Sequence, residues 1–94
     1  MPAAIPELLL SVASDGVISQ PVDAEVDARG LACPMPLLKA KLGLRNLAVN
    51  QCLRVLATDA GSLRDFVSFA QLTGQVIEGF YQQDGVYAYL IRKQ

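Results

Sequence analysis

One cysteine of the chain stands in an unusual setting. Cys33 opens the string Cys-Pro-Met-Pro, which precedes a run of leucines and lysines. We predict that Cys33 is the N-cap of a helix, with Pro34 at N1 and Pro36 at N3, where a missing amide proton costs little. The Met35 amide is then free to donate to the sulfur, and the positive end of the helix dipole favours an anion there. These features predict a favoured thiolate on a rigid, exposed corner, with Gly30 keeping the approach open.

Residue types that are missing narrow the chemistry further. The chain has no histidine, so a catalytic Cys-His pair is excluded, and two cysteines alone argue against a zinc site. Pro36 occupies the position of the second cysteine in a Cys-x-x-Cys pair, so a dithiol cycle is not expected. No glycine-rich phosphate loop is present. What remains is a single thiol that accepts a group and passes it on without a cofactor or metal. The plain alternative is a buried, inert cysteine.

Hydrophobic periodicity predicts the elements that must position this thiol. Alternation indicates strands, and apolar residues at intervals of three and four indicate helices. We expect Ser62 to be the N-cap of the second helix, with Asp65 completing a capping box, and Gly74 to end this helix. Asp84-Gly85 is typical of a hairpin turn. The predicted strands are 24–28, 52–57, 75–82 and 86–91, and the predicted helices are 34–48 and 63–73.

The order β-α-β-α-β-β predicts the architecture. Two helices can cover one face of a four-stranded sheet and leave the other face partly open. Crossover connections make the βαβ units parallel, and the last hairpin is antiparallel, so the sheet is mixed. We expect residues 22–94 to form this domain, and residues 1–21 to be an N-terminal extension that could be flexible.

Composition and charge indicate the kind of partner. The chain has 94 residues, 52% of them hydrophobic, as expected of one small globular domain. No apolar run reaches the roughly 18 residues of a membrane helix, and no secretory signal is evident, so we expect a cytoplasmic protein. Residues 29–94 hold all eight basic residues and four acidic ones, a net charge of +4. The basic residues form no dense cluster, which favours an acidic protein partner over direct nucleic-acid binding.

The segment VDARGLACPMPLLKAK resembles the TusA/SirA/YedF family of small sulfur-carrier proteins. Asp27, Arg29, Gly30, the Cys33 motif and Lys41 carry the resemblance, which extends from about Glu25 to Gln94. The resemblance implies a two-layer α/β sandwich and a sulfurtransferase-type cysteine, Cys33, that carries persulfide sulfur. It implies a cysteine desulfurase or rhodanese-like donor and a downstream acceptor protein, in tRNA thiolation or another sulfur pathway.

Further residues have both a functional and a structural interpretation. Lys41 and Arg45 follow Cys33 on one row of the first helix and could dock an acidic partner, or could form a solvated face. Asp59 lies in a loop that resembles one of the family and is a third docking candidate. Cys52 begins a strand and is interpreted as a core residue. Two other function classes stay open: a non-catalytic interaction or regulatory domain with the same fold, and an RNA-binding module.

Overall fold

The computed structural model describes residues 21–94 of the chain. Within this range the elements follow one another as β1 (Ala24–Ala28), α3 (Met35–Arg45), β2 (Cys52–Ala57), α4 (Ser62–Thr73), β3 (Val76–Gln83) and β4 (Val86–Arg92). The predicted order β-α-β-α-β-β is confirmed. Apart from its last residue, the predicted extension 1–21 lies outside the described residues. None of the described helices is long and apolar enough to cross a membrane.

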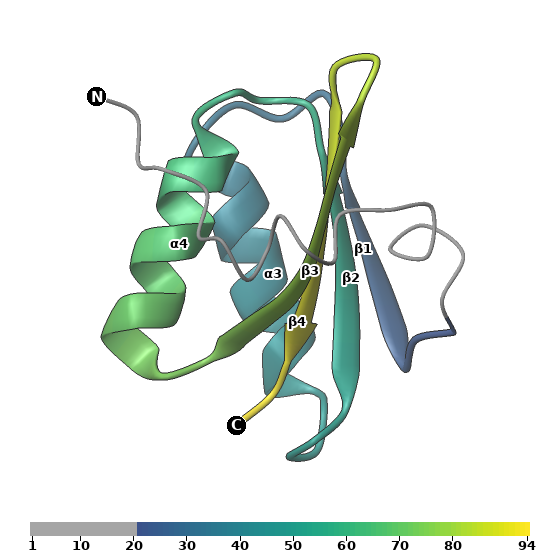
Figure 1. Ribbon diagram of the computed structural model, residues 1–94, viewed down its shortest axis with the longest axis vertical. Helices are drawn as coiled ribbons and strands as arrows, with labels where there is room; N and C mark the ends of the chain where they lie inside the picture. The colour runs from purple at the N-terminus through teal and green to yellow at the C-terminus, as the bar shows by residue number, and fades with distance from the viewer. Residues whose placement is uncertain (1–20) are drawn as a thin grey trace.

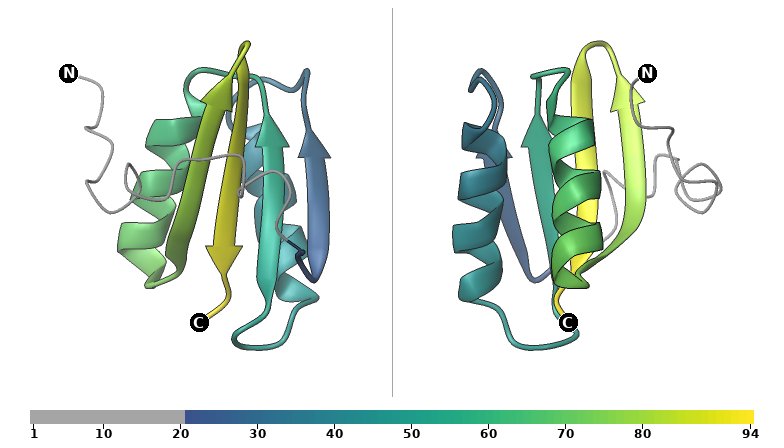
Figure 2. Two further views of the ribbon diagram at one scale, coloured as in Figure 1. Left: turned by 45° about the vertical axis from the view of Figure 1, so that its right-hand side comes forward. Right: turned by 90° about the vertical axis from the view of Figure 1, so that its left-hand side faces the viewer.

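The four strands form one mixed sheet in the order β1-β2-β4-β3. β1 pairs with β2 in parallel, and Val26 lies opposite Val55. β4 is antiparallel to both β2 and β3. Both helices pack on the same face of the sheet, as Figures 1 and 2 show. The expected two-layer arrangement is therefore confirmed, and the loops that follow β1 and β2 leave the same edge of the sheet.

The core fills the space between the helices and the sheet. Tyr89 of β4 is fully buried and stacks on Phe66 of α4, with ring centroids 4.4 Å apart. Phe80 of β3 lies 5.4 Å from the same tyrosine ring. The other buried members of this cluster are Ala40, Leu44, Leu53, Val55, Ala57, Ile77 and Ile91. This aromatic stack anchors α4 to the middle of the sheet.

The C-terminal end of α3 differs from the prediction, and one apolar residue of α4 faces the solvent. α3 ends at Arg45 rather than at residue 48, because the amides of Asn46 and Leu47 turn back to the carbonyls of Gly43 and Leu44. Ala48 consequently lies outside the helix and is exposed. Leu72, near the end of α4, is 86% exposed although it is apolar. At 3.6 residues per turn, a residue two positions beyond Ala70 points away from the sheet.

The predicted capping box of α4 is wrong. The N-cap is Gly61, no side chain caps the helix, and Ser62 is its first helical residue. The Ser62 hydroxyl is buried and shares a hydrogen bond of 2.7 Å with the hydroxyl of Tyr89. A buried tyrosine hydroxyl needs such a partner, so the serine hydroxyl bonds a core tyrosine instead of capping the helix. Gly74 ends α4 in the left-handed region, with φ 79°, as predicted.

A smaller apolar cluster lies on the sheet face opposite the helices. Cys52, Ala88 and Leu90 are buried there, with Val22, Leu56 and Tyr81 packed against them. Cys52 is 3% exposed, which confirms its predicted core role. Burial raises the pKa of its thiol, and the nearby Glu78 carboxylate adds to this effect. Cys52 is therefore a poor nucleophile.

The buried pair of hydroxyls generates a stability prediction. Replacing Ser62 by alanine leaves the Tyr89 hydroxyl without a partner and should lower the free energy of unfolding by roughly 1–3 kcal/mol. The double variant S62A/Y89F removes both hydroxyls and should lose less than the sum of the single variants. Urea unfolding of S62A, Y89F and the double variant measures this coupling. The exposed Ser68→Ala is the control, because it makes the same change in helix propensity on the same helix. Additive single effects would contradict the pairing.

Candidate functional site

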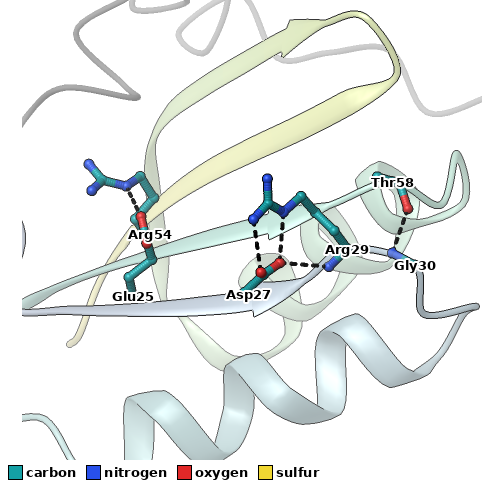
Figure 3. A network of polar contacts seen from close by, with 6 residues as sticks. All are labelled: Glu25, Asp27, Arg29, Gly30, Arg54 and Thr58. Atoms are coloured by element: carbon teal, nitrogen blue, oxygen red, sulfur yellow. Dashed lines mark hydrogen bonds and ion pairs between the residues drawn. The ribbon is translucent and has the colours of Figure 1, made fainter.

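Cys33 is an exposed residue in the loop between β1 and α3. This loop is attached to the loop between β2 and α4 by the Gly30 amide, which donates a hydrogen bond of 2.8 Å to the Thr58 hydroxyl (Figure 3). Gly30 has φ +82°, a conformation that side chains disfavour and glycine adopts freely. The glycine therefore sets the direction of the loop that carries Cys33, and a Cβ atom built on it would meet nothing within 4 Å.

The preceding aspartate and arginine stabilise the start of the same loop. Arg29 donates from Nε and Nη2 to the two carboxylate oxygens of Asp27, at 2.9 Å each (Figure 3). Its backbone amide also donates to Asp27 Oδ1 at 3.1 Å. These bonds lower the pKa of Asp27 to about 2. The Asp-x-Arg-Gly string thus folds back on itself where β1 ends.

The helix begins one residue later than predicted. Pro34 is the N-cap of α3, Met35 is the first helical residue, and Pro36 follows at N2. The Met35 amide donates to the carbonyl of Ala32 at 2.9 Å, so it is not available to the sulfur. The Cys33–Pro34 peptide bond is cis. Cys33 therefore lies outside the helix, and its sulfur is not the cap that the sequence predicted.

The sulfur has a different partner, which comes from the second helix. The Cys33 thiol donates a hydrogen bond to Oδ2 of Asp65, in the first turn of α4. This bond, together with desolvation and the negative charges of Asp65 and Asp59, raises the pKa of the Cys33 thiol above its ordinary value. The prediction of a favoured thiolate is therefore wrong for the resting protein. The sulfur faces the negative charge of a carboxylate and not the positive end of a helix dipole.

Three further residues surround this thiol and carboxylate. A Cβ atom built on Gly61 would lie 3.8 Å from Cys33 Cβ and 3.0 Å from Asp59 Oδ2, so the absence of a side chain leaves room between them. Asp59 Oδ2 accepts the Gly61 amide at 3.0 Å. Arg64 Nε lies 3.9 Å from Asp65 Oδ1, and its positive charge opposes the rise in the pKa of Cys33. Sequence reasoning missed Arg64 and gave Asp65 a capping role.

The remaining candidate residues lie at different distances from the sulfur. Asp59 is part of the turn beside Cys33, whereas Lys41 and Arg45 follow along α3. The Lys41 ammonium lies 5.6 Å from the centroid of the Phe69 ring of α4, a cation–π contact between the helices. Arg45 is exposed in the last turn of α3. The structure therefore gathers Cys33, Gly61, Asp59, Asp65 and Arg64 at one edge, and the basic row extends away from it.

Known proteins resemble the chain in sequence and in structure. The family described as "Sulfurtransferase TusA" matches residues 24–93. The "Sulfur carrier protein TusA" of Allochromatium vinosum is 44% identical over 71 residues, which are 76% of this chain and 93% of that protein. The protein of the same name from Pseudomonas paraeruginosa is 38% identical over 77 residues, 82% of this chain and 98% of its own length.

A solved structure agrees with these relatives. The crystal structure of a SirA-like protein from Desulfitobacterium hafniense has a TM-score of 0.65 and 28% sequence identity. The similarity covers 73% of this chain and 95% of that chain. The family match spans all the strands and helices described above and includes the loop of Cys33. The chain belongs to the TusA family of sulfur carrier proteins.

Proposed function

We propose that the chain carries sulfur as a persulfide on Cys33 and relays it between proteins. The observation that carries this proposal is the position of the thiol: Cys33 is exposed at a loop attached to the sheet edge, whereas Cys52 is buried. The donor in this proposal is a cysteine desulfurase or a rhodanese-like enzyme, which are the donors that the family resemblance implies. The acceptor belongs to tRNA thiolation or to another sulfur pathway.

The transfer is a thiol exchange that a single cysteine can perform. The sulfur of Cys33, as a thiolate, attacks the outer sulfur of a persulfide held on the donor's cysteine. A new S–S bond forms to Cys33, the S–S bond within the donor breaks, and the donor's cysteine leaves as a thiolate. The outer sulfur keeps its oxidation state, so no oxidant, reductant or cofactor takes part. Release to the acceptor is the same exchange in the other direction. A thiolate of the acceptor attacks the outer sulfur on Cys33, and Cys33 leaves as a thiolate.

The turn residues support this exchange by limiting the movement of the sulfur. Pro36 is buried against the core, and Pro34 joins the loop to the first turn of α3. Met35 is 44% exposed beside Cys33, and Leu38 is exposed to the same extent one turn later. Prolines reduce the conformational freedom of a loop, so Cys33 reaches a partner with little reordering.

Docking of the donor is proposed to involve the basic row. At about 1.5 Å per residue, Lys41 lies about 9 Å and Arg45 about 15 Å along the axis of α3 from Met35. Both side chains are exposed and could meet an acidic surface around the donor's active site. Asp59, half-buried beside Cys33, is included as a contact at the rim of the site.

One observation favours the alternative of a non-catalytic interaction or regulatory domain. The pKa of the Cys33 thiol is raised, so at neutral pH the resting thiol is mostly protonated and weakly nucleophilic. A domain that kept the fold without the transfer would tolerate such a thiol. The two functions differ in whether Cys33 gains sulfur.

The first experiment measures sulfur loading directly. The protein is incubated with a cysteine desulfurase and cysteine, and separately with a rhodanese and thiosulfate, and its intact mass is determined. We expect a gain of one sulfur atom that a reductant removes, present in Cys52→Ser and absent in Cys33→Ser. No gain with either donor would refute the carrier and select the alternative, and a gain that survives Cys33→Ser would refute Cys33 as the residue that carries the sulfur.

A second experiment tests the basic row. Lys41→Glu and Arg45→Glu should each lower the loading rate several-fold at low ionic strength, because charge steers association. The difference should shrink in salt as the Debye length falls to about 10 Å at ~0.1 M. Lys39→Glu is the matched control, since Lys39 lies on α3 beside the edge strand β1, in the groove with Glu25 and Leu42. Equal losses in all three variants would attribute the effect to net charge and not to docking.

A further inference from the structure

The contact between Cys33 and Asp65 joins the reacting sulfur to a carboxylate. The thiol is exposed and points to Oδ2 of Asp65, whose side chain is only 20% exposed. The carboxylate therefore lies behind the sulfur and leaves its outer side open to a partner. No other hydrogen bond involves the sulfur of Cys33 within residues 21–94.

The other charged groups around this contact face atoms other than Oδ2 of Asp65. Its other oxygen, Oδ1, faces Arg64 Nε at 3.9 Å, and the Arg64 side chain is mostly exposed. The second nearby carboxylate belongs to Asp59, and its Oδ2 already accepts the Gly61 amide at 3.0 Å. Of the three charged side chains that act on Cys33, only Asp65 contacts the sulfur.

We propose that Asp65 is the general base of sulfur loading, the group that removes the proton of Cys33 as its sulfur attacks the donor's persulfide. This role rests on the proposed function. The S–H bond of Cys33 breaks as the new S–S bond forms, and the proton moves to Oδ2 of Asp65. The donor's S–S bond breaks, and the departing donor thiolate takes the proton from Asp65. One protein thiol is replaced by another, so protons and electrons balance.

The same contact has the opposite effect on reactions that occur without a partner. A carboxylate beside a thiol disfavours the thiolate, and small electrophiles in solution react with the thiolate. Asp65 therefore lowers the reactivity of Cys33 toward such reagents. In a docked complex the proton can leave during the attack, and a base that is already in hydrogen-bond contact is well placed to take it. A general base and a mere suppressor of the thiolate thus predict opposite consequences of its removal.

Asp65→Asn distinguishes these two roles, because the amide has the same shape but no negative charge. Two rates are measured in wild type and variant across pH 6–10: alkylation of Cys33 by iodoacetamide, and single-turnover loading from a desulfurase that already holds its persulfide. We expect alkylation at neutral pH to become faster and loading to become slower, by about tenfold or more for loss of a general base. Loading of the variant should recover as pH rises, when solvent removes the proton. Asp65→Glu should recover part of the loading rate.

Other outcomes would overturn the role of Asp65 as a general base. Loading by Asp65→Asn at the wild-type rate or faster, with faster alkylation, would make Asp65 only a suppressor of the thiolate and would overturn its role as a base. Asp84→Asn is the control for the change in charge, because Asp84 lies in the β3–β4 turn at φ 53°, which asparagine also tolerates. Thermal unfolding checks that each variant is folded. If the wild type itself takes no sulfur from any donor, the proposed function fails and the role of Asp65 fails with it.

Discussion

The parallel pairing of β1 with β2 is the constraint on which the site depends. Because both strands end at the same edge, the loop that carries Cys33 and the loop that starts α4 lie side by side, attached by Gly30 and Thr58 (Figure 3). Cys33 and Asp65 are 32 residues apart in the chain and still share a hydrogen bond. The second βα unit is therefore part of the site as well as part of the fold.

The C-terminal strand holds both helices in place. β4 lies between β2 and β3, and its Tyr89 stacks on Phe66 and bonds Ser62 at the start of α4. Just after β4, the Lys93 ammonium donates hydrogen bonds of 2.8 Å each to the carbonyls of Leu44 and Leu47 at the end of α3. Positive charge is favourable at a helix C-terminus. The position of α4, and with it that of the carboxylate beside Cys33, thus depends on residues far along the chain from the motif.

The sequence predicted the elements well because each depends on local periodicity and turn chemistry. Gly74 and the Asp84-Gly85 turn ended their elements where expected. The ease with which a residue adopts a positive φ depends on its own side chain, so it can be predicted from the residue type. The predictions that failed at the site concerned the partner of a polar side chain. Ser62 and Asp65 have the spacing of a capping box, but the first bonds a core tyrosine and the second bonds the thiol. Spacing alone cannot indicate a partner supplied by another strand or loop.

The error about the thiolate changes how a sulfur carrier of this kind is understood. An exposed thiolate is the form of cysteine that oxidants and stray electrophiles attack, so a carrier with a permanent thiolate would be modified readily. The raised pKa of Cys33 keeps the resting sulfur neutral. Once loaded, an anionic persulfide on Cys33 would face the carboxylates of Asp65 and Asp59, and like charges in proximity repel. In the proposed relay, that repulsion would favour release of the sulfur to an acceptor. A weakly held cargo suits a relay protein, and the same carboxylate that protects the empty thiol would promote delivery from the loaded one.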